Sequence, residues 1–155
     1  MDQRVAVTGL GAVTPLGNEV SSYWDGLVAG RSAVGLITAY DTSDSAVRIA
    51  AEIKDLDVDG LLGRRRARRT DRFAQVALIA ADEAVADAGL DFGENELGRD
   101  AAVILGSAIG GITTLLNGAV ALSDRGERRV SGRMIPMMMS NAAAGEIAIR
   151  FGLHG

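Results

Sequence analysis

A stretch near the middle of the chain, residues 70–88, constrains the fold most, because its helical pattern is apolar on nearly every side. The apolar residues that share one face at helical spacing are Phe73, Val76, Ala77, Ala80 and Ala84. Those on the other sides are Leu78, Ile79, Ala81 and Val85, and Gly89 follows as a stop signal. A helix of this kind is buried over most of its circumference, so the fold must place other layers around it.

Short apolar runs on either side of this helix predict the layer against which it packs. We expect buried strands at residues 5–8 and 101–106, and a half-exposed strand at 47–53. Further helices are predicted at 112–123 and 142–151, with a polar loop at 125–133. A sheet this thin needs partner layers on both faces. We therefore predict an α/β chain that is part of a larger layered assembly.

A short helix is also expected before Gly30, ending at Leu27 and capped by Asn18 or Ser21. The chain holds no cysteine, which excludes disulfides, thiolate metal sites and a cysteine nucleophile within these 155 residues. Its one histidine, His154, cannot build a two-histidine metal site. We therefore expect neither a metal nor a cofactor bound by the chain itself.

The charge and hydropathy patterns restrict partners and location. A net charge of −4 argues against general nucleic-acid binding. No signal-peptide pattern precedes Val5, and no window of about eighteen uninterrupted apolar residues occurs. We expect a cytoplasmic protein without a membrane-spanning helix.

The opening stretch VAVTGLGAVTPLG raises the question of phosphate binding, because a strand followed by close glycines begins many dinucleotide-binding folds. That fingerprint needs a third small residue and an acidic residue about twenty positions further on. Here Thr14 takes the third position, Pro15 follows it, and residues 30–32 hold no carboxylate. We therefore interpret Gly9 and Gly11 as a structural turn.

The stretch GRRRARRTDRF concentrates positive charge in an otherwise acidic chain. Its arginines are Arg64, Arg65, Arg66, Arg68, Arg69 and Arg72. At the start of a helix these cations oppose the macrodipole and repel one another, so a merely solvated helix start is an unsatisfactory explanation. Arginine suits bidentate contact with phosphate or carboxylate. An anionic partner is indicated, either nucleic acid or an acidic protein that carries a phosphate group.

Two later segments combine small or apolar residues at places where ligands and partners bind. LGSAIGG, residues 105–111, lies at the end of the predicted strand at 101–106, and Ile109 is its one sizeable projecting side chain. MIPMMM is apolar and adaptable, with a kink expected at Pro136. Turn formation explains the first segment, and core filling explains the second. For the methionines, an interface or an acyl-chain pocket is the more specific alternative.

Taken together, these segments resemble the N-terminal part of the β-ketoacyl-acyl carrier protein synthases, nearest the chain-elongating type II condensing enzymes. The resemblance rests on VAVTGLGAVTPLGNEV, WDGLVAGRSAVGLI, ARRTDRFAQVALIAADEAVADAGL, LGSAIGG and MIPMMMSNAAAGEIAIRFGLHG, in this order. It implies a thiolase-like α/β fold of two related halves, with residues 1–155 forming most of the first half only.

The resemblance implies fatty-acid elongation by decarboxylative Claisen condensation with malonyl-acyl carrier protein. In the family a cysteine just after the FGLxG turn carries the acyl group, and two histidines of the second half assist. None of these catalytic residues lies in this segment, and His154 is expected to be a loop residue. No bound cofactor is implied, because phosphopantetheine arrives on the carrier protein.

Some family positions carry over to this sequence. The residues that align with carrier-protein contacts are Arg65, Arg68 and Arg69. Ile109 aligns with a side chain that gates the acyl pocket, and the segment that the family places at the homodimer interface and partner pocket contains Met134, Ile135 and Met137. The methionines replace smaller or β-branched residues. Alternatives are a polyketide ketosynthase or chain-length-factor subunit, and a non-catalytic carrier-binding or dimerising module.

Overall fold

The computed structural model describes residues 4–93 and 97–155 of the chain. Its elements in chain order are α1 (Val20–Val28), β1 (Val34–Leu36), β2 (Ile49–Ala51), α2 (Val58–Leu62), α3 (Arg64–Ala67), α4 (Arg72–Asp87), α5 (Leu97–Asp100), α6 (Ile112–Arg125), the 3-10 helix η1 (Glu127–Arg129), α7 (Met134–Met138) and α8 (Ala142–Phe151). The predicted helices at 112–123 and 142–151 are confirmed as α6 and α8, and η1 lies in the segment predicted as a polar loop.

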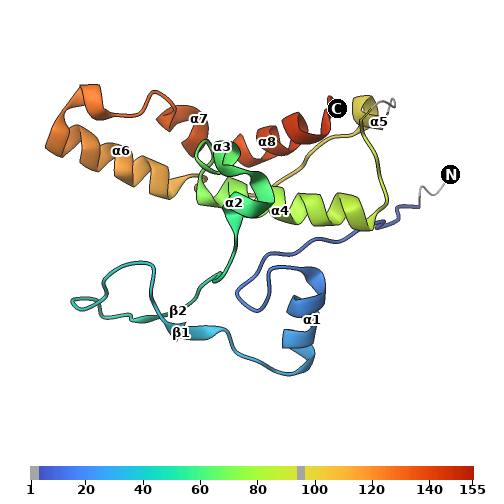
Figure 1. Ribbon diagram of the computed structural model, residues 1–155, viewed down its shortest axis with the longest axis horizontal. Coiled ribbons are helices and arrows are strands. Elements are labelled where there is room, and N and C mark those ends of the chain that lie inside the picture. Colours follow the sequence, from blue (N-terminus) through green and yellow to red (C-terminus); the bar gives the residue numbers. More distant parts are fainter. Residues whose placement is uncertain (1–3, 94–96) are drawn as a thin grey trace.

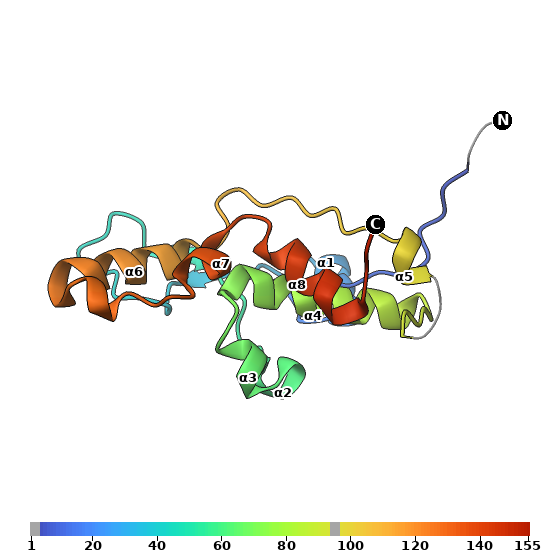
Figure 2. The same ribbon diagram turned by 90° about the horizontal axis from the view of Figure 1, so that it is seen from above.

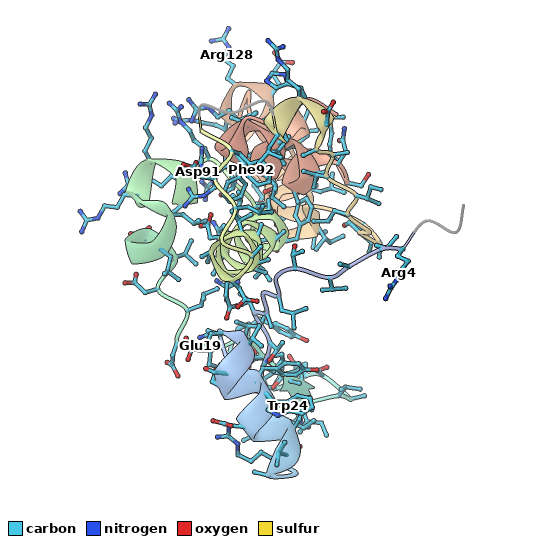
Figure 3. All side chains as sticks on the ribbon, turned by 90° about the vertical axis from the view of Figure 1, so that its right-hand side faces the viewer. Arg4, Glu19, Trp24, Asp91, Phe92 and Arg128 are labelled. Atoms are coloured by element: carbon cyan, nitrogen blue, oxygen red, sulfur yellow. The ribbon has the colours of Figure 1, made fainter. Side chains whose placement is uncertain are left out.

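The longer helices form an elongated layer, with α1 and the two strands on one side of it (Figure 1). In this layer α4 packs beside α8, and α6 packs against α7. The view turned by 90° shows α2 and α3 projecting on one side, while the chain between α5 and α6 runs extended on the other (Figure 2). Figure 3 looks at one end of the molecule and places Trp24 of α1 far from Arg128 of η1.

The buried centre lies where α4 meets α2 and α8. Leu78 of α4 is fully buried, and it clusters with Leu62 of α2 and Ile147 of α8. Val13 of the N-terminal segment packs against the same cluster. The long helix predicted from the apolar pattern is confirmed, and its contacts in several directions explain why the pattern is apolar on most sides.

The beginning of α4 is fixed by Asp71, which is buried and caps two helices. One carboxylate oxygen accepts a hydrogen bond from the N–H of Phe73, in the first turn of α4, at 3.4 Å. The other accepts from the N–H of Thr114, in the first turn of α6, at 2.9 Å and from the Thr114 hydroxyl. Helix N-termini leave N–H groups unpaired and carry partial positive charge, so the single Asp71 carboxylate stabilises the N-termini of both α4 and α6.

The glycine-containing turn near the N-terminus packs directly onto α4. A Cβ added at Gly11 would lie 1.9 Å from the carbonyl oxygen of Ala80, and one added at Gly9 would lie 2.2 Å from that of Ala84. Only glycine permits so close an approach of two backbones. The prediction that these glycines are structural is confirmed.

Two carboxylates of α4 hold the same turn through its backbone. The N–H of Leu10 donates to Asp87 at 2.9 Å, and the N–H of Ala12 donates to Glu83 at 2.8 Å. Glu83 also accepts from the N–H of Val20, the first residue of α1, at 2.7 Å. The N–H groups that a phosphate would need are therefore bound to anions of the protein.

The cap predicted for α1 was wrong. The helix begins after Glu19, and neither Asn18 nor Ser21 accepts a hydrogen bond from its first turn. The Asn18 amide donates instead to the Lys54 carbonyl at 2.9 Å, and the Ser21 hydroxyl donates to Glu19 at 2.8 Å. The helix start is satisfied by the distant Glu83 carboxylate, which no local sequence pattern reveals.

Two predicted strands are corrected by the structure. Residues 5–8 and 101–106 belong to no strand within the described parts of the chain. These apolar runs have no neighbouring strand among the described residues to pair with, and their side chains are open, since Val5 is 94% exposed and Ile104 is 99% exposed. The prediction at 47–53 is confirmed by β2, which pairs antiparallel with β1, a strand that the sequence pattern did not reveal.

Replacing Gly11 by alanine is expected to destabilise the protein. The added Cβ would overlap the Ala80 carbonyl, and overpacking of this kind costs about 1–3 kcal/mol. Urea denaturation measures the change in the free energy of unfolding. Gly35→Ala is the matched control, because a Cβ there meets nothing within 4 Å. Equal effects of the two substitutions would contradict the close-packing role of Gly11.

Replacing Asp71 by alanine should remove the caps of α4 and α6 together. Each lost cap costs about 1 kcal/mol, so we expect a loss of about 2 kcal/mol in the free energy of unfolding. Asp57→Ala is the comparison, because Asp57 caps only the five-residue α2, through the N–H of Gly60. If thermal or urea unfolding shows the same loss for both variants, the double cap is refuted.

Candidate functional site

The arginine-rich segment folds into a short helix of its own. Asp57 caps the preceding helix α2, and Gly63, at φ +76°, breaks the chain between α2 and α3. Positive φ is readily adopted by glycine. The long helix α4 begins only at Arg72, after Asp71. Of the six arginines, Arg64, Arg65 and Arg66 lie at the start of α3 and Arg72 at the start of α4, as expected for a helix start.

The arginines on and after α3 differ in whether a carboxylate neutralises them. The Nε of Arg64 lies 3.9 Å from a carboxylate oxygen of Asp59. The Nε of the half-buried Arg66 lies 3.9 Å from a carboxylate oxygen of Glu146 in α8. Three others are exposed and make no ion pair within residues 4–93 and 97–155: Arg65, Arg68 and Arg69. These are the three residues that the sequence predicts for an anionic partner.

Arg133, at the start of α7, belongs to the same cluster, although the sequence analysis missed it. Its guanidinium, and to a smaller extent that of Arg65, lowers the pKa of Arg69 below its ordinary value. Neighbouring positive charges disfavour the protonated form of a guanidinium, so the lowered pKa reflects the concentration of positive charge at this place. We call Arg65, Arg68, Arg69 and Arg133 the basic cluster. An arginine directly before an apolar run was the signal that could have identified Arg133.

A surface pocket of about 380 Å³ opens beside the basic cluster, between α3 and α8. Its lining residues are Leu62, Gly63, Arg65, Arg66, Arg69 and Glu146. The planar guanidinium fork matches the geometry of carboxylate and phosphate groups. The arrangement is therefore suited to holding an anionic group at the protein surface.

The turn that carries Ile109 lies against the end of α7. Gly110 adopts φ +78°, and the N–H of Gly111 donates to the Met138 carbonyl at 3.0 Å. Ile109 itself is 62% exposed. An apolar pocket of about 540 Å³ lies between this turn and α4, with Phe73 among its lining residues, but Ile109 does not line it.

The methionine-rich segment forms α7, which packs on α6. The Met134 sulfur lies 2.1 Å from where a Cβ on Gly118 of α6 would be, so Gly118 makes room for it. Met137 is half-buried and Ile135 is 57% exposed. The kink predicted at Pro136 was wrong, because this residue lies in the first turn of α7, where no helical N–H is needed.

The structure thus brings the predicted residues into two adjacent groups. The basic cluster reaches α7 through Arg133, which directly precedes Met134. The turn of Ile109 meets the opposite end of α7, at Met138. The basic cluster and the turn of Ile109 therefore lie at the two ends of one short helix, which itself carries Met134, Ile135 and Met137.

The described residues offer little for other kinds of chemistry. Among them no three His, Cys, Asp or Glu side chains are grouped to hold a metal ion. His154 lies in the loop after α8, as predicted, and its N–H donates to the Gly98 carbonyl at 2.8 Å. None of the helices in the described ranges has the length and apolar character needed to cross a membrane.

Comparison with known proteins identifies the family. The sequence family model described as the N-terminal domain of β-ketoacyl synthase matches residues 2–155. A protein of Synechocystis sp. named 3-oxoacyl-[acyl-carrier-protein] synthase 2 is 46% identical over 154 residues, which cover 99% of this chain and 36% of that protein. The chain therefore spans about a third of the length of the curated relatives that it matches.

Solved structures agree with the sequence match. A β-ketoacyl synthase from Burkholderia phymatum STM815 superposes with a TM-score of 0.77 at 27% identity, covering 96% of this chain and 37% of that one. The ishigamide ketosynthase/chain length factor gives a TM-score of 0.78 at 30% identity, covering 95% and 36%. The predicted thiolase-like α/β fold is confirmed. With the family model matching nearly every residue, the chain belongs to the β-ketoacyl synthase family and corresponds to its N-terminal domain.

Proposed function

We propose that the chain is the N-terminal portion of a 3-oxoacyl-[acyl-carrier-protein] synthase that elongates fatty acids. The proposal is supported by the family match and by the name of the 46% identical relative. The proposed synthase acts as a homodimer in the cytoplasm and takes its substrates from an acyl carrier protein. It needs no cofactor of its own.

In the proposed reaction an acyl group passes from its thioester to a nucleophilic cysteine and releases the carrier thiol. A malonyl thioester then loses carbon dioxide, and the resulting carbanion attacks the acyl-cysteine carbonyl and expels the thiolate. The product is a 3-oxoacyl thioester that is two carbons longer. These 155 residues contain no cysteine, so the nucleophile must come from outside them. We assign to this segment carrier docking and part of the acyl pocket.

One observation carries the docking role: the exposed arginines of the basic cluster have no carboxylate partner within the described chain. In a chain of net charge −4, a concentration of unneutralised guanidinium groups favours an acidic partner and steers its approach. An acidic carrier protein fits this chemistry. Arg65, Arg68 and Arg69 are the proposed contacts.

The apolar residues are assigned to the acyl chain and to the partner subunit. Ile109 and Ile135 are both more than half exposed, which is unfavourable for large aliphatic side chains unless something covers them. We propose that Ile109 gates the acyl pocket and that Met134, Ile135 and Met137 of α7 contribute to the dimer interface and pocket wall. The exposed apolar surface also disfavours the alternative of a stand-alone binding module.

One comparison favours a second function, that of a polyketide ketosynthase or chain-length-factor subunit. The ishigamide ketosynthase/chain length factor is 30% identical and superposes with a TM-score of 0.78. Mass spectrometry of the products distinguishes the two functions. A fatty-acid synthase extends a saturated acyl primer by one two-carbon unit per condensation, whereas a polyketide system gives an unreduced poly-β-keto chain. A chain-length factor alone forms no acyl-enzyme.

Reversing the charge of Arg65 and Arg68 together should weaken carrier binding by the full-length synthase. Each exposed ion pair is worth about 0.2–1 kcal/mol, so we expect KM for the acyl-carrier substrate to rise about tenfold for Arg65→Glu with Arg68→Glu. Steady-state kinetics with acyl-carrier protein and with a small acyl thioester measure this. KM for the small thioester should not change, because it lacks the acidic protein.

Arg4→Glu is the control, since it makes one such charge reversal on the N-terminal segment, on the opposite side of the molecule from α2 and α3 (Figure 3). An unchanged KM for the carrier substrate in the double variant would refute docking at the basic cluster. The same rise in KM for Arg4→Glu would show that overall charge, and not this surface, attracts the carrier.

A further inference from the structure

Arg133 is held at the start of α7 by its backbone, while its side chain remains exposed. Its carbonyl accepts the first hydrogen bond of the helix, from the N–H of Met137, at 3.1 Å. Its own N–H donates to the Ser131 hydroxyl at 3.2 Å. No carboxylate pairs with its guanidinium in the described ranges, so the backbone is fixed while the charge is left unneutralised there.

The position of Arg133 relative to α3 is set by a tight junction at Gly111. A Cβ added there would lie 2.7 Å from the Met137 carbonyl oxygen and 3.0 Å from a carboxylate oxygen of Asp71. Arg133 lies one helical turn before Met137, and Arg69 lies two residues before Asp71. The junction therefore brings α7, which Arg133 precedes, to the start of α4, which follows Arg69 in the chain. Figures 1 and 2 show α7 beside the start of α4.

We propose that Arg133 is a carrier-docking residue, and that the docking surface crosses from α3 to the start of α7, where Arg69 and Arg133 together bind acidic side chains of the carrier protein. This inference rests on the proposed function and extends it to a residue outside the arginine-rich segment. It also gives the docked carrier direct contact with the helix that carries Met134 and Ile135.

The energetics of the cluster support this assignment. Repulsion from Arg133 is the largest cause of the lowered pKa of Arg69, so two like charges lie near each other, and neither is paired with a carboxylate of the described residues. Arg66 is different, because Glu146 already offsets its charge. An acidic partner that reaches both Arg69 and Arg133 removes the repulsion and gains two charge-assisted contacts.

Binding of the acyl carrier protein to the full-length synthase tests the proposal. Removing one exposed docking charge in Arg133→Gln should raise Kd about fivefold and flatten its dependence on salt. Arg133→Lys keeps the charge and should retain most of the affinity. Arg4→Gln is the control and should leave Kd unchanged. The melting temperature of Arg133→Gln should not fall, because the substitution relieves repulsion.

A double-mutant cycle with Arg69→Gln tests whether the two arginines share the same acidic partner. The combined loss of affinity should differ from the product of the single losses, since the residues are coupled through that partner. If Arg133→Gln binds like the unmodified synthase while Arg65→Glu with Arg68→Glu binds weakly, the docking surface ends at α3 and the inference is wrong, although the proposed function stands. If both leave Kd unchanged, docking at the whole cluster is refuted.

Discussion

The arrangement of the described chain depends on one buried carboxylate, that of Asp71. It satisfies the first turns of α4 and α6, whose partial positive charges would otherwise face each other without compensation. The same carboxylate lies 3.0 Å from the position of a Cβ on Gly111, where the end of α7 also arrives. The basic cluster, the Ile109 turn and the methionine helix therefore take their relative positions from this contact.

The carboxylates of Glu83 and Asp87 have a related role on the other side of α4. They bind backbone N–H groups of the N-terminal turn and the first N–H of α1. A glycine pair that resembles a phosphate-binding loop is thus occupied by the protein's own anions. The N–H groups of the turn thus hold it against α4, and the exposed arginines of the basic cluster are the groups that we propose for an external anion.

The sequence predicted the elements whose stability comes from their own pattern. The long apolar helix, α6 and α8 follow from local periodicity, and the departures from the dinucleotide fingerprint at Thr14 and Pro15 indicated that Gly9 and Gly11 are structural. The sequence could not predict features that depend on distant partners. The runs at 5–8 and 101–106 have strand composition, but no neighbouring strand pairs with them in the described residues. The Glu83 cap and the approach of Arg133 to Arg69 join residues more than 60 positions apart.

The hydrogen bonds from α4 to the N-terminal turn also constrain the order in which the chain can acquire structure. Leu10 and Asp87 are 77 residues apart, and Val20 and Glu83 are 63 apart. During synthesis the first twenty residues leave the ribosome long before the helix that binds them, and contacts of such long sequence separation form slowly. The N-terminal turn and the start of α1 therefore complete their hydrogen bonding only after α4 has been made, although they are translated before it.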